Sequence, residues 1–242
     1  MLAWGDSALR FSRLFERSLG AILMYHSIGE PLGNVFTRAP TVDEFERQMV
    51  FLRETCDVVR LRDFFTDARE RPERKRVAIT FDDGYMNFFT RALPVLVRHK
   101  IPSTVFVITG RIGEESYMRV QELQDIAKMP LVDIGNHGRL HVDQSHAPLR
   151  EVLESEIVGA KEDLESLLGS EVSAFAYPFG EWSEVSREIV ARSHALAVTA
   201  TPGVIEATTD RYLLGRVDGA KESFSAFRFD LTDLRYAIAK FP

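Results

Sequence analysis

Two adjacent carboxylates end an apolar segment in the first half of the chain. Residues 77–81 read Val-Ala-Ile-Thr-Phe, and Asp82, Asp83 and Gly84 follow directly. A near-continuous apolar run is typical of a parallel strand covered on both faces, and barrels and open sheets place their chemistry at the carboxyl ends of such strands. Neighbouring side chains of an extended chain point in opposite directions. One carboxylate could therefore hold a metal while the other takes a proton from the metal's water, although Asp-Asp-Gly is also an ordinary turn sequence.

Two histidines four residues apart follow a second apolar segment. They lie in Gly135-Asn-His-Gly-Arg-Leu-His-Val142. On one helical turn, residues at i and i+4 share a face, so His137 and His141 could hold one divalent ion with a carboxylate as third ligand and water completing the shell. The alternative is a pair of solvated loop histidines. This alternative is disfavoured because the Asp pair and the His pair both fall at strand ends, where a barrel would bring them together.

The composition is that of one globular domain, 1–242. The chain has 242 residues, of which 45% are hydrophobic and 27% are charged, and α/β barrels commonly run to roughly 250 residues as one unit. A net charge of −6 and the lack of a basic run longer than residues 74–76 argue against a nucleic-acid partner. Cys56 is the single cysteine, which excludes a disulfide framework and a cysteine zinc cluster.

The first residues predict a helix over 6–19 and not an export signal. Phe11, Leu14, Phe15 and Leu19 recur at helical intervals, and charged residues interrupt the place where the hydrophobic region of a signal peptide would lie. No apolar stretch approaches the ~20 residues that cross a bilayer. We therefore expect a cytoplasmic protein. The apolar face of this helix would dock on its own domain, with a membrane interface or a partner protein as alternatives.

Strand and helix patterns alternate along most of the chain. This alternation argues for a parallel sheet with right-handed crossovers, and roughly seven or eight strands over this length favour a closed or nearly closed α/β barrel. The predicted strands cover residues 21–25, 57–61, 77–81, 104–108, 131–134, 172–177, 196–200 and 213–216. The predicted helices cover residues 6–19 with Gly20 as C-cap, 41–52, 64–65, 87–100 with a bend near Pro94, 120–129, 153–167 ended by Gly169, a helix capped by Ser183, and 223–241.

Three of these polar motifs together resemble a known family. Residues 80–84 (Thr-Phe-Asp-Asp-Gly), the pair His137 and His141, and residues 176–180 (Ala-Tyr-Pro-Phe-Gly) occur in this order. They are similar to the first three motifs of the polysaccharide deacetylases, the NodB-like carbohydrate esterases of family 4. The resemblance covers roughly residues 22–217. It implies a distorted (β/α)7-type barrel.

The resemblance also implies a role for each motif residue. Asp83, His137 and His141 would be the metal ligands, and Asp82 would be the general base that helps form hydroxide from water whose pKa the metal lowers to about 7. The backbone N–H of Tyr177 would help to stabilise the developing oxyanion. The implied cofactor is a divalent metal, zinc first, with nickel, cobalt or manganese as alternatives.

The third motif departs from the family's pattern at one position. The family often carries an arginine two residues before the motif's proline, where it pairs with the catalytic base, and that position is Ala176 here. A motif-like arginine, Arg216, occurs later in Leu214-Gly-Arg-Val217. We hypothesise that Arg216 reaches Asp82 from a later strand. The alternative is a surface arginine on a sheet edge.

The position of the catalytic acid also departs from the family's pattern. Many members use a histidine near the C-terminal end, but none follows His194 in this sequence. Residues 23–27 (Leu-Met-Tyr-His-Ser) are similar instead to a subgroup that acts on poly-N-acetylglucosamine and takes its acid from an N-terminal strand. Because His26 ends a predicted strand, it can face the barrel mouth, and we hypothesise that it is the general acid. The alternative is a structural histidine.

The implied activity is that of a metal-dependent hydrolase. It would remove an acetyl or related acyl group from an amino sugar of a surface polysaccharide or of its lipid-linked precursor, and membrane contact would arise only through such a lipid-linked substrate. A deformylase or a cyclic-imide amidohydrolase on the same scaffold stays open, as does a non-catalytic glycan-binding protein. The intact Asp82, Asp83, His137 and His141 count against a pure binder, which needs no base and metal together.

Overall fold

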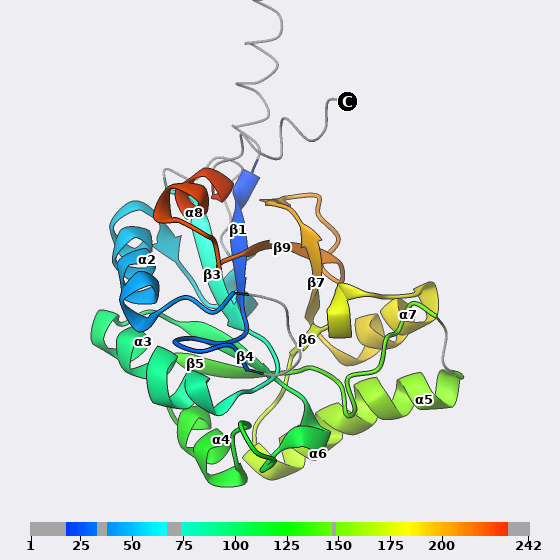
Figure 1. Cartoon of the computed structure of the whole chain (residues 1–242). Helices are drawn as coiled ribbons and strands as arrows, with labels where there is room; N and C mark the ends of the chain where they lie inside the picture. The colour runs from blue at the N-terminus through cyan, green and yellow to red at the C-terminus, as the bar shows by residue number, and fades with distance from the viewer. Residues whose placement is uncertain (1–17, 33–37, 67–73, 147–148, 232–242) are drawn as a thin grey trace, which may run out of the picture.

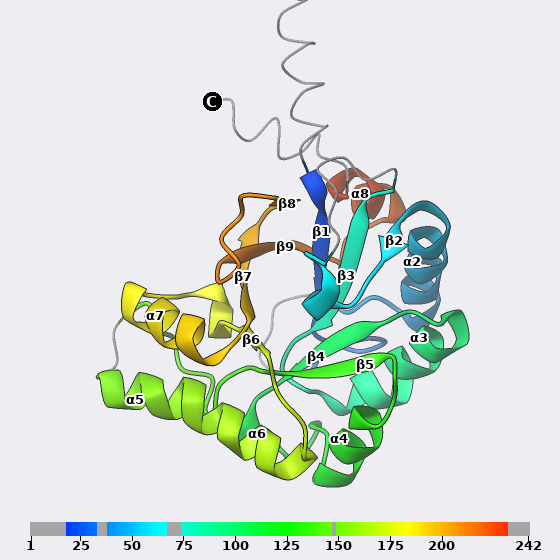
Figure 2. The same cartoon turned by 180° about the vertical axis from the view of Figure 1, so that it is seen from behind.

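The computed structural model describes residues 18–32, 38–66, 74–146 and 149–231. Within them, seven strands form a closed parallel barrel surrounded by helices (Figure 1 and, from behind, Figure 2). The ring closes because β1 pairs with both β3 and β9. The predicted (β/α)7 barrel is therefore confirmed. In ring order the strands are β1 (Ser18–Tyr25), β3 (Arg76–Phe81), β4 (Ser103–Val107), β5 (Val132–Asn136), β6 (Ala174–Ala176), β7 (Leu196–Pro202) and β9 (Leu214–Asp218).

Strand β1 begins earlier than the sequence predicts. Ser18 and Leu19 belong to this strand, so they do not end a helix and Gly20 is not a helix C-cap. The remainder of the predicted helix 6–19 lies outside the described residues. Glycine is needed at position 20 because a Cβ atom there would lie 1.8 Å from the carbonyl oxygen of Arg76 on β3. The early start therefore comes from close pairing between β1 and β3, which local helical periodicity does not reveal.

Two short strands extend the sheet. Strand β2 (Asp57–Val58) pairs in parallel with β3, and β8 (Ile205–Glu206) pairs antiparallel with β1. The predicted strand 57–61 is shortened because a 3-10 helix, η1 (Leu61–Asp63), replaces its end. Leu61 and Phe64 are buried in the cluster that fills the barrel, so this turn serves to plug the interior.

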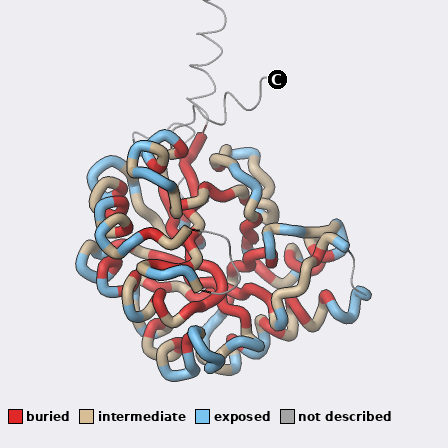
Figure 3. Tube along the Cα trace, in the orientation of Figure 1, coloured by how far each residue is buried: buried red, intermediate tan, exposed pale blue. Residues whose placement is uncertain are grey.

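The helices cover the outside of the barrel, while the strands are largely buried (Figure 3). The helix predicted over residues 87–100, bent or begun anew near Pro94, consists of the π-helical turn η2 (Phe88–Ala92) followed directly by α3, which begins one residue before Pro94. Among the described residues, no helix is long and apolar enough to cross a membrane. The helices are α2 (Val42–Thr55), α3 (Leu93–His99), α4 (Val120–Ala127), α5 (Arg150–Glu154), α6 (Ala160–Leu168), α7 (Glu184–Ser193) and α8 (Phe224–Asp230).

Alternate strand residues divide the core into an inner and an outer layer. Ala78 of β3 and Phe106 of β4 belong to the cluster inside the barrel, whereas their neighbours Ile79 and Val105 pack with residues of the covering helices. This alternation follows from the two-residue period of a strand. It leaves the polar residues at the strands' C-terminal ends at one mouth of the barrel.

The helix predicted over residues 153–167 forms as three joined pieces. Helix α5 passes through the π-helical turn η4 (Ser155–Gly159) into α6, and Gly169 ends the run in a left-handed conformation with φ 67°. Leu153, Ile157 and Leu164 of the predicted apolar stripe are buried. The π turn lies beside the carboxyl end of β5, because Asn136 of β5 donates to the Ile157 carbonyl oxygen of the turn.

Pairing around the barrel is uneven. Strands β1 and β3 share six consecutive residue pairs, whereas β5 and β6 share only the pair Asn136–Phe175. A cavity of about 450 Å³ is lined by the first residues of these two strands, including Asp133 and Ala174, and by Thr104 of β4. The β5–β6 join is thus the least continuous part of the barrel wall.

A buried histidine behind β5 should make stability depend on pH. His194 is 5% exposed, and burial, followed by the charge of Lys161, lowers its pKa to about 3. Since the unfolded chain binds this proton near pH 6.5, stability is lost as the pH falls from about 6.5 toward 3, by up to about 1.4 kcal/mol per pH unit. Urea unfolding between pH 7 and 4.5 should show a shallower pH dependence for His194→Asn than for the wild type. Parallel curves would contradict this expectation.

Candidate active site

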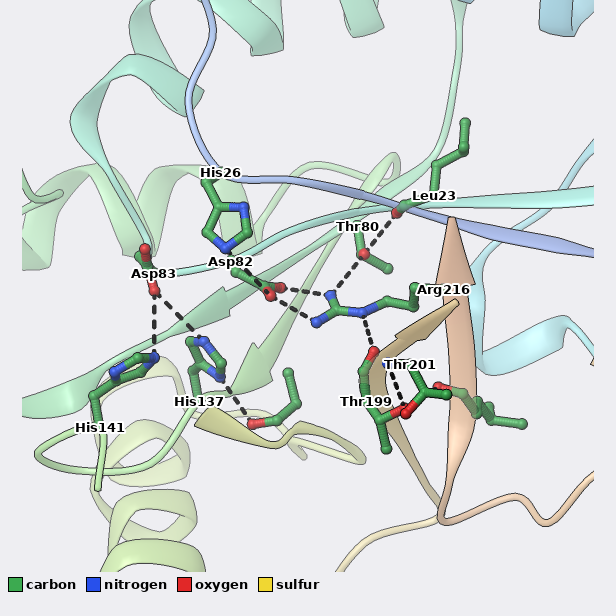
Figure 4. Close-up of polar contacts among 12 residues, drawn as sticks. Leu23, His26, Thr80, Asp82, Asp83, His137, His141, Thr199, Thr201 and Arg216 are labelled. Atoms are coloured by element: carbon green, nitrogen blue, oxygen red, sulfur yellow. Dashed lines mark hydrogen bonds and ion pairs between the residues drawn. The ribbon is translucent and has the colours of Figure 1, made fainter. Parts of the chain in front are cut away.

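One carboxylate and two imidazoles converge at the barrel mouth. Asp83 Oδ1 lies 3.5 Å from His137 Nε2 and 3.8 Å from His141 Nε2, and candidate ligand atoms of the three residues all lie within 4.8 Å of one another. Figure 4 shows both rings directed at Asp83. His137 Nδ1 is 2.8 Å from the Ala176 carbonyl oxygen, so Nδ1 donates a hydrogen bond there and the ring presents Nε2 to the cluster as the atom that would bind a cation. This donor set suits zinc and neighbouring divalent ions.

Tight backbone turns place these three ligands. Asp83 follows β3 with φ 73°, and Gly84 continues the turn with φ 77°. β5 extends through Asn136, beyond the predicted end at residue 134, and delivers His137 directly. The predicted helical turn between the two histidines is absent, since residues 137–141 form a loop in which Gly138 and His141 have φ values of 81° and 60°. The loop turns back on itself and thereby brings both rings to one point.

The two aspartates make this cluster attract positive charge. Burial would lower the pKa of His137, but the hydrogen bond to Asp83 and the charges of both aspartates raise it above its ordinary value, so a cation bound here would displace a proton from His137 Nε2. Burial and the neighbouring His137 lower the pKa of His141 to about 4, so its Nε2 lone pair is available. Burial alone would raise the pKa of Asp83, but the hydrogen bond with His137 and the nearby imidazoles bring this pKa below its ordinary value. A neutral imidazole and an ionised carboxylate are the forms that bind metals.

Asp82 is held by a buried arginine. Arg216 of β9, 1% exposed, donates from its two terminal nitrogens to Asp82 Oδ1 and Oδ2, each at 2.7 Å. The same guanidinium donates to the Thr199 carbonyl oxygen at 2.8 Å and to the Thr80 hydroxyl at 3.1 Å. The hypothesised contact between Arg216 and Asp82 is therefore present. Burial would raise the pKa of Asp82, but Arg216 and the nearby histidines hold it well below its ordinary value.

His26 approaches Asp82 from another direction. It follows β1, its Nε2 lies 4.0 Å from Asp82 Oδ2, and its side chain is 20% exposed. The ring of His26 points toward Asp82 (Figure 4). The first and last strands in chain order, β1 and β9, thus bring His26 and Arg216 to the same carboxylate, that of Asp82.

The expectation for Tyr177 needs correction. Its backbone N–H already donates to the Val198 carbonyl oxygen at 3.1 Å, in the pairing of β6 with β7, so it is not available to an oxyanion. Two residues later, Phe179 lies in the short 3-10 helix η5 (Pro178–Gly180) with φ 58°. Its ring centroid is 4.4 Å from that of His141, and in the described part of the chain its N–H has no hydrogen-bond acceptor. The available amide is therefore that of Phe179.

Comparison with known sequences identifies related proteins. The profile of the polysaccharide deacetylase family matches residues 69–198. The protein YxkH of Bacillus subtilis (strain 168) is 27% identical over 200 residues, which cover 81% of this chain and 70% of YxkH. A poly-beta-1,6-N-acetyl-D-glucosamine N-deacetylase of Staphylococcus aureus (strain MSSA476) is 32% identical over 101 residues, but these cover only 39% of this chain and 35% of that enzyme.

Solved structures share the whole barrel. The Streptococcus pyogenes deacetylase PplD superposes with a TM-score of 0.78 at 23% identity, over 88% of this chain and 97% of PplD. IcaB from Ammonifex degensii gives a TM-score of 0.74 at 25% identity, over 90% of this chain and 97% of IcaB. The fold is the NodB-like barrel. Since the family profile spans more than half of its length, the chain belongs to the polysaccharide deacetylase family.

Proposed function

We propose that this protein is a metal-dependent hydrolase that removes the N-acetyl group from amino sugars of a glycan. The observation that carries the proposal is the Asp83-His137-His141 cluster directly beside Asp82, a carboxylate kept ionised by Arg216. The staphylococcal relative named as a poly-beta-1,6-N-acetyl-D-glucosamine N-deacetylase supports this substrate class. The structure of PplD, solved with acetate, supports acetyl as the group removed.

Each side chain has a defined task in this reaction. A divalent ion bound by Asp83, His137 and His141 would supply a water of lowered pKa and an electrophile for the acetyl oxygen. Asp82 accepts the proton of the attacking water, and Arg216 fixes both of its oxygens. The free N–H of Phe179 donates to the acetyl oxygen as negative charge develops there.

His26 completes the reaction as the general acid. A sugar amine is a poor leaving group and must be protonated as the C–N bond breaks. His26 is exposed enough to meet substrate and lies 4.0 Å from Asp82, so it can take up the proton that the base has received.

Replacing His26 by alanine should therefore affect substrates unequally. Turnover of an N-acetylated sugar should fall at least about 10²-fold, whereas an activated aryl acetate, whose leaving group needs no proton, should lose much less. Steady-state kinetics on both substrates, with metal content measured on the same samples, checks this. Equal losses on both substrates would contradict an acid role for His26.

Product analysis tests the proposed reaction. The metal-free protein is reconstituted with zinc, nickel, cobalt or manganese and incubated with chitooligosaccharides and poly-β-1,6-N-acetylglucosamine. Acetate release that requires added metal supports the proposal. Formate from an N-formyl sugar, or an opened cyclic imide, identifies one of the sister activities, and glycan binding without product identifies a non-catalytic binder. A lipid-linked precursor, membrane contact through it and a cytoplasmic location stay predictions from the sequence.

A further inference from the structure

We propose that Glu156 is a positioning residue, which sets the shape of the loop between the two histidine ligands. The inference rests on the metal-binding part of the proposed function. Glu156 lies on the π-helical turn η4, outside all the sequence motifs, and is 2% exposed. It acts through the backbone of residues 138–140, which joins His137 to His141.

The carboxylate of Glu156 captures consecutive loop amides. Its Oε2 accepts from the backbone N–H of Arg139 at 3.1 Å and from that of Leu140 at 3.0 Å, and Oε1 lies 3.2 Å from the same Leu140 nitrogen. The amide before them, that of Gly138, donates to Asn136 Oδ1 at 2.9 Å. All three amides between the ligands are therefore oriented by side chains from outside the loop.

The carbonyl side of the loop is fixed as well. Gly138 and Arg139 accept hydrogen bonds from the backbone N–H groups of Thr109 and Gly110, at 3.1 and 2.8 Å. The loop is thus clamped between residues 109–110 on one side and Glu156 on the other. A loop held in this way cannot relax by rotating its peptide planes, so the spacing of the two imidazoles is set before a metal arrives.

The position of Glu156 depends on the π turn. Ala160 donates its N–H to the carbonyl oxygen of Ser155, five residues back, and the Ile157 carbonyl oxygen accepts from Asn136 Nδ2 at 2.8 Å. The turn therefore contacts the end of β5 through Ile157 and the ligand loop through Glu156. π-Helical turns are often found at functional sites, and here the turn joins the loop to the barrel wall.

Glu156 has few partners besides these amides. In the described residues no cationic side chain pairs with it, because the Arg139 guanidinium donates to Asp163 and Ser155 instead. A buried carboxylate that depends on backbone donors is costly to leave unsatisfied. Gly138 permits the close approach, since a Cβ atom at φ 81° would lie 3.1 Å from Glu156 Oε2.

Metal affinity measured without substrate tests this role. Zn²⁺ affinity is determined by competition with a chromophoric chelator, and the ligand geometry by the visible absorption of the Co²⁺ form. Glu156→Ala should weaken Zn²⁺ binding ~10–100-fold, the usual effect of losing a residue that orients metal ligands. Glu156→Gln should stay much closer to the wild type, because one amide oxygen can still accept from both Arg139 and Leu140.

Glu165 offers a matched control. It lies on α6 and also accepts a backbone N–H, that of Val172 at 2.8 Å, but Val172 precedes β6 at the opposite end of the barrel. Glu165→Ala should lower the melting temperature of the metal-free protein while leaving Zn²⁺ affinity and the Co²⁺ spectrum unchanged. Comparing Glu165→Ala with Glu156→Ala therefore separates the general effect of losing a helical carboxylate from the specific effect of losing the orientation of the ligand loop.

The outcomes distinguish this role from general stability. If Glu156→Ala does not fold, Glu156→Asp replaces it, since the shorter side chain keeps the charge but withdraws from the loop amides, and weaker Zn²⁺ binding is again expected. Zn²⁺ affinity equal to that of Glu165→Ala, with an unchanged Co²⁺ spectrum, overturns the inference. Absence of acetate release by a wild type that binds Zn²⁺ would overturn the proposed reaction and leave the role of Glu156 standing.

Discussion

Asp82→Asn is expected to lower turnover of an N-acetylated glycan about 10²–10⁴-fold, the range for loss of a general base. Asparagine keeps the shape of the side chain but cannot accept the proton of the attacking water. Asp82 is not one of the three clustered ligands, so the variant should retain its metal. Asparagine still accepts a hydrogen bond from Arg216 but leaves its buried charge unpaired, so the variant should also be less stable. The expected signature is a destabilised but metal-loaded and nearly inactive protein, measured by acetate release and metal analysis on one sample at a temperature where it is folded.

Asp83→Asn serves as the control for this prediction. It changes the adjacent residue by the same single atom, yet it removes the ionised ligand of the cluster and should lose metal and activity together. Added metal in excess should restore part of the activity of Asp83→Asn and none of that of Asp82→Asn. Recovery of Asp82→Asn at high metal concentration would show that Asp82 is a ligand and not the base.

Arg216→Met should be strongly destabilising and should also shift the pH dependence of activity. The substitution leaves Asp82, 3% exposed, as a buried charge without its guanidinium partner, and breaking such a pair costs about 3–5 kcal/mol. Burial then raises the pKa of Asp82 with only the nearby histidines opposing it, so the base is protonated at higher pH than in the wild type. The acid limb of kcat/KM should move to higher pH, and activity should recover as the pH rises.

Two measurements check the role of Arg216. Denaturant unfolding gives the stability loss, and a pH–kcat/KM profile on the folded fraction gives the position of the acid limb. Arg216→Lys should fall between the wild type and Arg216→Met, because lysine keeps the charge but not the two-pronged contact. If the acid limb of the kcat/KM profile lies at the same pH in Arg216→Met as in the wild type, this arginine has only a structural role.

The ligand set could be predicted from strand order together with the resemblance to the polysaccharide deacetylases. Asp82 and His137 each follow a strand directly, and in a parallel barrel all such ends meet at one mouth, while the resemblance assigned Asp83 and the two histidines as ligands and Asp82 as the base. The contact between Arg216 and Asp82 was a hypothesis from the resemblance, because the third motif lacks its usual arginine and Arg216 lies in a later motif-like segment. The positions of the strand ends alone would not have paired these residues, since Arg216 is the middle residue of β9.

Details that depend on loop conformation could not be predicted. The spacing of His137 and His141 suggested a helical turn, but backbone hydrogen bonds to residues 109–110 and to Glu156 impose a loop instead. The assignment of the oxyanion donor to Tyr177 failed because the sequence does not reveal that the Tyr177 N–H donates to Val198 of β7. Glu156 gives no sequence signal, since one acidic residue beside an apolar stripe resembles an ordinary solvated helix face.

The barrel wall is held unevenly, and a bound ion would compensate for this. β6 touches β5 through a single residue pair, so thermal opening should begin there, and backbone amides of Ala174–Ala176 should exchange with deuterium sooner than those shared by β1 and β3. Asn136 belongs to that single residue pair, and His137 is the next residue in the chain. His137 Nδ1 lies 2.8 Å from the carbonyl oxygen of Ala176 on β6, so a cation that held the His137 ring would steady this contact across the join and retard the exchange. The catalytic ion would then also act as a cross-link that keeps the cylinder shut.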